Sequence, residues 1–132
     1  MCEEPFLCAA TRSAGHSAEV YSKGEAEREL GRVFKELELP RQELVVTTKI
    51  HFGTDLKSPN TKGLSRKHII EGLKASLERL QLDHVDVVHA HRDDPNVDMV
   101  EIVKAFSWCI DNGLAHYWAT SMCASMLIER SA

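Results

Sequence analysis

Two apolar runs decide the fold of this chain, LVVTTK at residues 44–49 and VDVVHAH at residues 85–91. The first run is apolar and β-branched nearly throughout, which is typical of a strand that helices cover. A third short strand is expected at residues 116–119. Because these runs alternate with helical segments, they predict strand–helix–strand units with parallel strands and right-handed crossovers.

The segments around these runs have the apolar spacing of amphipathic helices. One is expected from about residue 23 to Pro40, a second from an N-cap at Ser65 to about residue 80, and a third ending at Asn112-Gly113. Their buried faces are predicted to be Ala26, Leu30, Val33, Phe34 and Leu37, then Ile69, Leu73, Leu77 and Leu80, then Val100, Val103, Phe106 and Ile110. The charged residues of the second helix, Arg79 among them, are expected on the solvated surface.

The two ends of the chain give weaker signals. Residues 1–15 show no periodicity and contain at best one short strand, at residues 6–8. At the other end, Ser121 or Ser125 is expected to cap a last helix.

Composition excludes several classes of function. The chain has 132 residues and 43% hydrophobic content, enough for one globular domain. A net charge of −4 gives no basic excess that would favour nucleic acid or an anionic membrane as a partner. No apolar run reaches the roughly 18 residues of a membrane span. Four cysteines without zinc-type or CxxC spacing predict a reducing, cytoplasmic setting.

Three residues could carry chemistry together: Tyr21, Lys49 and His91. Lys49 and His91 each end a predicted strand, and the ends of parallel strands are where such folds keep their sites. Carbonyl reduction needs a hydride donor and a proton donor. A tyrosine can be the acid where a nearby ammonium lowers the pKa of the phenol and an imidazole holds the substrate oxygen. Each residue alone is more often structural, so the prediction depends on their convergence.

A metal-dependent hydrolase is a weaker alternative. His89 and His91 are two residues apart, so both side chains point to one face of a strand and could bind a divalent metal. A further ligand would be needed, and the sequence does not decide between His51, Asp55 and His116. His89 as a hydrogen-bonded core residue is the better interpretation, and no metal site is predicted.

Several motifs resemble one known family in the same order along the chain. They are AEVY at residues 18–21, VTTKI at 46–50, GLSRKHIIEGLKASLERL at 63–80, VDVV at 85–88, HRDDP at 91–95 and YWATS at 117–121. Together they resemble the aldo-keto reductase superfamily, and more narrowly the branch that contains the β-subunits of voltage-gated potassium channels. The similarity covers roughly residues 17–132, and the eighteen-residue run is very specific.

The resemblance implies a (β/α)8 barrel that uses NADP(H) to reduce aldehydes or ketones. Tyr21 falls at the position of the general acid, Lys49 at that of its partner, and His91 at the position that orients the substrate and contacts the cofactor. Ser121 and Met122 fall where the family contacts the nicotinamide end of the cofactor. The alternative implied by the same branch is a non-catalytic, regulatory subunit with a membrane channel as its partner, peripheral to the membrane through that partner.

Three departures from the family pattern predict an impaired enzyme. His16 stands where the family has an aspartate, so the fixed negative charge that orients Lys49 is missing. Residues 1–15 do not match, and residues 16–132 are predicted to be a partial reductase domain. The chain also ends after the fifth of eight strands, roughly half a barrel, as expected of a truncated gene model or splice product. Such a half-barrel exposes sheet edges, which predicts marginal stability and self-association.

Overall fold

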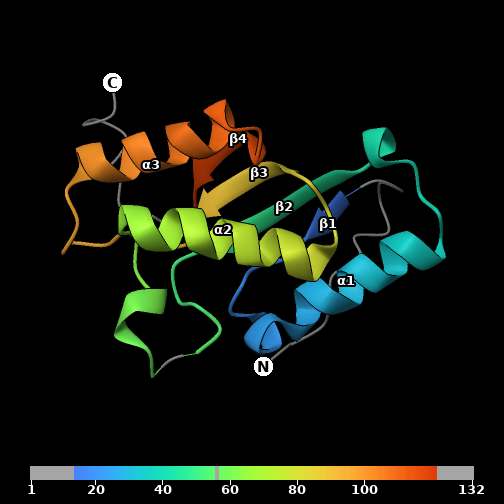
Figure 1. Cartoon of the computed structure of the whole chain (residues 1–132), viewed down its shortest axis with the longest axis horizontal. Coiled ribbons are helices and arrows are strands. Elements are labelled where there is room, and N and C mark those ends of the chain that lie inside the picture. Colours follow the sequence, from blue (N-terminus) through green and yellow to red (C-terminus); the bar gives the residue numbers. More distant parts are fainter. Residues whose placement is uncertain (1–13, 56, 122–132) are drawn as a thin grey trace.

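The three predicted strands are present, and each lies parallel to its neighbour (Figure 1). The computed structural model describes residues 14–55 and 57–121. Within them the strands are β1 (Ala14–His16), β2 (Val45–Ile50), β3 (Val85–Ala90) and β4 (Ala115–Thr120), in the sheet order β1-β2-β3-β4. The α-helices are α1 (Glu25–Glu36), α2 (Arg66–Leu80) and α3 (Met99–Asp111), and short 3-10 turns occur at Tyr21–Gly24, Arg41–Glu43 and Pro59–Thr61.

The helices lie side by side on one face of the sheet. The order of the strands in the sheet follows their order in the chain, so right-handed crossovers carry every connecting helix to the same side. Helix α2 contacts α1 on one flank and α3 on the other (Figure 1). The predicted α/β class with parallel strands is confirmed.

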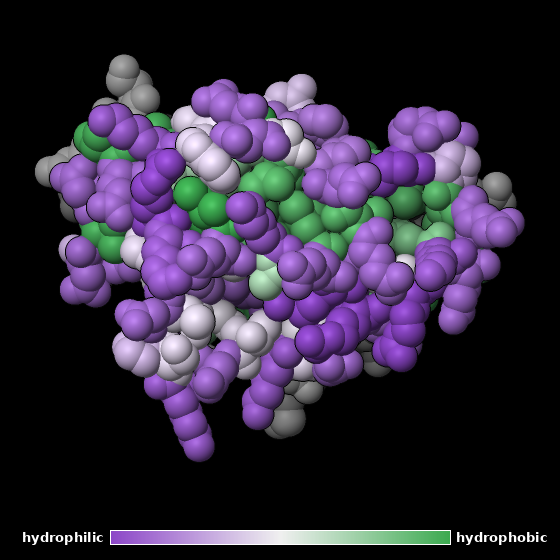
Figure 2. Space-filling view, in the orientation of Figure 1, coloured by the Kyte–Doolittle hydropathy of each residue, from purple (hydrophilic) through white to green (hydrophobic). Residues whose placement is uncertain are grey.

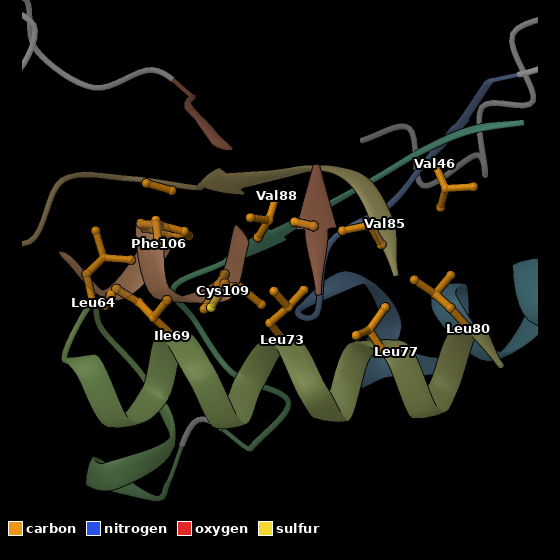
Figure 3. Packing of buried hydrophobic residues seen from close by; sticks show 14 of the residues in the cluster. Val46, Leu64, Ile69, Leu73, Leu77, Leu80, Val85, Val88, Phe106 and Cys109 are labelled. Carbon is orange, nitrogen blue, oxygen red and sulfur yellow. The ribbon is translucent and has the colours of Figure 1, made fainter. Parts of the chain in front are cut away.

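The apolar core fills the space between the helices and the covered face of the sheet. All four apolar residues predicted for the second helix are buried, and Figure 3 shows Ile69, Leu73, Leu77 and Leu80 pointing from α2 toward the strands. The predicted cap is also present, since the Ser65 hydroxyl accepts a hydrogen bond from the backbone N–H of His68 at 3.2 Å. Sequence periodicity therefore identified α2 in both position and orientation.

The outer helices were predicted less accurately. Leu37 is 62% exposed and Val100 is 57% exposed, although both were assigned to buried faces. In α1 the buried positions are Glu27, Gly31 and Phe34, so the face that meets the sheet is rotated away from the most apolar stripe. The apolar pattern did not identify this face because it begins with a buried charged residue, Glu27.

That buried charge is Glu27, and its partner is Arg79, which was wrongly expected on the solvated surface. The Arg79 Nε donates to Glu27 Oε2 at 2.7 Å, and the Thr48 hydroxyl donates to Glu27 Oε1 at 2.5 Å. The close contact of α1 with the end of α2 depends on Gly31, where a Cβ atom would lie 2.6 Å from the carbonyl oxygen of Leu80. A buried ion pair between two helices leaves no periodic signal in a sequence.

Strand β1 was not predicted, because Ala14, Gly15 and His16 carry no apolar pattern. It forms because its backbone pairs with β2 in the register His16–Thr47 and because Gly15 leaves room for α1. A Cβ atom at Gly15 would lie 2.9 Å from the Phe34 ring. The expected strand at residues 6–8, the last helix and its alternative cap Ser125 lie outside the described residues.

The opposite face of the sheet is not covered by any helix of the described residues. Register places two rows of side chains on it: His16, Thr47, Val87 and Tyr117 in one row, and Lys49, His89 and Ala119 in the next. These side chains are mostly polar or half-exposed. Figure 2 shows the other side of the molecule, with α2 in front as in Figure 1: hydrophilic residues dominate, and a band of hydrophobic residues is visible along the upper side of α2.

Candidate active site

The ends of three strands bring Tyr21, Lys49 and His91 together. The Nζ atom of Lys49 lies 3.4 Å from the hydroxyl oxygen of Tyr21 and 5.0 Å from the centre of its ring. The rings of Tyr21 and His91 meet edge to face, with centroids 6.0 Å apart and planes at 87°. A phenol, an ammonium and an imidazole therefore converge, as their placement at strand ends predicts.

The backbone after β1 positions Tyr21. The chain continues along β2 for three more residues: Ser17 N–H donates to Thr47 O at 2.9 Å, and Glu19 N–H donates to Lys49 O at 3.2 Å. It then turns through Ser22 (φ 47°), Lys23 (φ 55°) and Gly24 (φ 90°) before α1 begins. Two successive non-glycine residues in the left-handed region store backbone strain next to Tyr21, which is typical of functional sites.

Lys49 is held by a backbone carbonyl. Its Nζ donates to the carbonyl oxygen of Ser17 at 2.9 Å, so the amine has a fixed partner although residue 16 is not a carboxylate. The His16 ring meets the Thr47 hydroxyl instead, with Nδ1 and Oγ1 2.8 Å apart. The missing carboxylate is thus replaced as a hydrogen-bond acceptor by a carbonyl dipole, which carries no fixed negative charge.

His91 is buried and neutral at physiological pH. Its backbone N–H donates to Ile50 O at 3.1 Å, which extends the pairing of β3 with β2 by one residue. Burial, together with the positive charges of Arg92 and Lys49 and with His51, lowers the pKa of the His91 ring from 6.5 to about 4. Its Nδ1 atom is buried without a hydrogen-bond partner, so this ring has an unused polar atom inside the site.

No sequence pattern pointed to Phe52 or to the pair Glu19 and His68. The Phe52 ring packs edge-on against His91, with centroids 5.2 Å apart. Glu19 is 2% exposed, and its Oε1 lies 3.0 Å from the Nε2 of His68, which is itself 4% exposed. Glu19 belongs to the AEVY motif, but only the tertiary structure shows that its side chain points inward.

The predicted cofactor residues lie at neighbouring strand ends. Ser121 directly follows β4, and its backbone N–H donates to Ala90 O at 2.9 Å, one residue before His91. Met122 lies outside the described residues. Ser121 and His91 are thus adjacent at the same end of the sheet, where the resemblance puts the nicotinamide.

The geometry does not favour the alternative metal site. His116 lies against His84, with ring centroids 4.7 Å apart, near the starts of β4 and β3 and therefore far along the sheet from His91. Within residues 14–55 and 57–121, no three His, Cys, Asp or Glu side chains are grouped closely enough to hold a metal ion. His89 is half-buried with its Nδ1 lacking a hydrogen-bond partner, so the expected hydrogen-bonded core role is also not seen at that atom.

The fold is that of a β/α protein with parallel strands, and comparison identifies its family. A model described as the aldo/keto reductase family matches residues 14–130. The chain therefore belongs to the aldo/keto reductase family.

No helix among the described residues is long and apolar enough to cross a membrane.

Curated relatives place the chain within that family. A putative voltage-gated potassium channel subunit beta of Schizosaccharomyces pombe is 54% identical over 115 residues, covering 87% of this chain and 33% of the relative. A probable voltage-gated potassium channel subunit beta of rice (Oryza sativa subsp. japonica) is 47% identical over 123 residues, covering 90% of this chain and 37% of the relative. The chain thus spans about a third of the length of these relatives, and the predicted branch is confirmed.

Solved structures confirm the predicted barrel fragment. The thermostable aldo-keto reductase Tm1743, in complex with the inhibitor epalrestat, matches with a TM-score of 0.75 and 26% identity over 88% of this chain and 38% of that chain. The holo form of aldo-keto reductase AKR11C1 from Bacillus halodurans matches with a TM-score of 0.74 and 25% identity over 89% of this chain and 39% of that chain. The four parallel strands described here correspond to part of such a barrel.

Proposed function

We propose that this chain carries the proton-transfer part of an NADP(H)-dependent reductase that acts on aldehydes and ketones. The observation that supports the proposal is the distance of 3.4 Å between the Lys49 Nζ and the Tyr21 hydroxyl, beside the ring of His91. The same three residues match the family pattern. Proposals about the whole protein rest on this constellation, because the chain spans only part of its relatives.

Each of the three residues has a distinct task. The Tyr21 hydroxyl donates its proton to the substrate carbonyl oxygen, and the Lys49 ammonium stabilises the negative charge that develops on the phenol oxygen. The neutral His91 ring can donate one hydrogen bond and so orient the carbonyl. NADPH, when bound, supplies the hydride.

The residues present fit the nicotinamide end of such a cofactor. His91 and Ser121 lie at adjacent strand ends, and the buried, unpaired Nδ1 of His91 is a polar atom that a polar ligand could satisfy. They would hold the carboxamide-bearing ring next to Tyr21, and the family resemblance assigns Met122 to the same group. No residue of this chain is assigned to the rest of the cofactor.

The proposal is tested by Tyr21→Phe in the full-length protein, with Tyr117→Phe as the matched control. We expect Tyr21→Phe to lower the rate of NADPH-dependent carbonyl reduction by at least about 100-fold, because the proton donor is removed. NADPH affinity, measured by fluorescence titration, should stay within about twofold. Tyr117 is 69% exposed, and its variant should keep full activity. An active Tyr21→Phe enzyme would remove Tyr21 from the mechanism.

A second candidate is a non-catalytic subunit of a membrane channel, in a cytoplasmic setting. Two observations favour it: both curated relatives bear that name, and His16 replaces the family carboxylate. Fluorescence titration of the chain with NADPH separates the candidates. Saturable binding supports the reductase. Absent binding, together with retention on an immobilised cytoplasmic segment of a potassium channel, supports the subunit.

A further inference from the structure

Glu19 is a buried carboxylate that joins three segments around the candidate site. Its Oε1 atom accepts hydrogen bonds from the backbone N–H of His51 at 2.7 Å and of Gly53 at 2.8 Å, and it lies 3.0 Å from His68 Nε2. Its own backbone N–H donates to Lys49 O at 3.2 Å. One side chain thus ties the turn after β1, the loop after β2 and the first turn of α2.

The surroundings of Glu19 are built to hold an ionised carboxylate. Burial alone would raise the pKa of this carboxyl, but the hydrogen bond and charge of His68 and the backbone N–H groups of Gly53 and His51 hold the pKa below its ordinary value. Gly72 of α2 leaves the room, since a Cβ atom there would lie 3.2 Å from Glu19 Oε2 and 3.1 Å from the His68 ring.

The loop held by Glu19 has a constrained backbone. Gly53 has φ 70°, and a Cβ atom at this position would lie 2.0 Å from the carbonyl oxygen of Thr61. The loop therefore turns back on itself, with two N–H groups directed at one carboxylate oxygen. A neutral side chain such as glutamine would keep one acceptor oxygen but lose the negative charge that strengthens these hydrogen bonds, so the loop would be held less firmly.

Phe52 lies between the two residues that Glu19 holds, and its ring packs against His91. Tyr21 follows Glu19 by two residues. The carbonyl oxygen of Lys49 accepts a hydrogen bond from the backbone N–H of Glu19. We propose that Glu19 is the positioning residue of this site: its carboxylate holds the His51–Gly53 loop, and with it the Phe52–His91 contact, against the turn that carries Tyr21. This inference rests on the proposed reductase function only for its kinetic consequence.

Glu27 offers a matched control within the same chain. It is also a fully buried glutamate with two partners, the Thr48 hydroxyl and the Arg79 guanidinium. Thr48 belongs to the covered face of β2 and Arg79 to α2, so both partners lie between the sheet and the helices. If Glu19 served only to stabilise the fold, substitutions of Glu19 and Glu27 should therefore have the same effect on kcat.

The experiment compares Glu19→Gln with Glu27→Gln in the full-length protein. We expect Glu19→Gln to lower kcat by at least about tenfold, while the Kd for NADPH changes by less than about twofold. Glu27→Gln should lower resistance to urea and leave kcat within about twofold. Equal kcat values in wild type and folded Glu19→Gln would overturn the proposal, and so would equal losses of kcat in both variants.

Glu19→Asp provides the second variant should Glu19→Gln fail to fold. It keeps the charge but is one methylene shorter, so it reaches fewer of the three donors. We expect a loss of kcat of a few fold, intermediate between wild type and Glu19→Gln where both are measurable, with unchanged NADPH affinity. Activity of Glu19→Asp within experimental error of wild type would overturn the proposal.

A spectroscopic measurement separates this inference from the reductase function. The NMR signals of the Phe52 and His91 rings should shift in Glu19→Gln or Glu19→Asp and stay unchanged in Glu27→Gln, whether or not the protein reduces carbonyls. If the wild-type protein reduced no carbonyl and the Glu19 variants still showed these shifts, the reductase function would be wrong and the positioning role would be supported. Unshifted ring signals in a folded Glu19 variant would overturn the positioning role alone.

Discussion

The two faces of the sheet use alternate residues of the same strands for different purposes. On the covered face, Val46 and Ile50 of β2 and Val88 of β3 are completely buried against the helices. On the other face, Lys49 and His89 stand side by side in register, with no helix of the described part of the chain above them. The difference teaches that the folding energy of this unit comes from one face and its candidate chemistry from the other.

The two faces also differ in whether their buried polar groups have hydrogen-bond partners. On the covered side, the Thr48 hydroxyl and the Arg79 guanidinium both have Glu27 as an acceptor. At the site end of the open face, the Nδ1 atoms of His89 and His91 are buried without partners. Buried polar atoms are usually paired, so these two nitrogens are open hydrogen-bonding positions that a ligand at the site could satisfy.

The largest expected effect is on stability, from the covered face. Leu73 is fully buried between α2 and the sheet, and Leu73→Ala should lower the free energy of unfolding by about 2–5 kcal/mol, because it leaves a cavity in the core. Tyr117→Ala on the open face should change it by less than about 0.5 kcal/mol. Urea unfolding followed by circular dichroism measures both. Similar losses in the two variants would end the distinction between the faces.

The next effect is the pH dependence that His91 imposes. The folded ring has a pKa of about 4, whereas the unfolded chain binds a proton near pH 6.5. Between these values the unfolded state holds more protons, so stability falls as pH drops from 6.5 toward 4, by up to about 3 kcal/mol. Urea unfolding at several pH values measures the slope.

His91→Asn serves as the control for this pH dependence, because asparagine does not titrate. The variant should show a smaller loss of stability between pH 6.5 and pH 4 than the wild type. If stability depended on pH identically in His91→Asn and wild type, the pKa of His91 would not be lowered in the folded protein. His91 would then behave as a solvent-exposed histidine.

The smallest of the three effects is on the rate of carbonyl reduction, and it comes from His16, which pairs with Thr47 on the open face. His16→Asp should place a carboxylate near Lys49, add an ion pair at the site and raise the rate of carbonyl reduction about tenfold, which corresponds to about 1.4 kcal/mol of transition-state stabilisation. His16→Asn has a similar shape without the charge and should give no gain. Equal rates in the two variants would show that the carbonyl of Ser17 already suffices to hold Lys49.

Self-association remains a prediction, and the edges of the sheet are where it can be tested. Among the strands described here, β1 and β4 are the outermost, and Tyr117 of β4 is 69% exposed. Exposed strand edges invite pairing with other chains.

Much of the fold followed from the sequence. The spacing of Ile69, Leu73 and Leu77 defined α2 and its buried face, and Ser65 marked its first turn, because these signals are local and repeat along the chain. Strands β2, β3 and β4 followed from apolar runs. The site followed in part, since Lys49 and His91 each lie at the end of such a run, and parallel strands bring their ends together.

Other features had no local signal. Strand β1 exists only through its pairing with β2, and Arg79 is buried only because Glu27 of another helix faces it. The sequence by itself determined strands β2, β3 and β4, helix α2 that covers them and the three side chains of the candidate site. Only the tertiary structure decided which carbonyl holds Lys49, which way Glu19 points and which ring packs on His91, because contacts between residues far apart in sequence are set by how the elements pack and not by their own patterns.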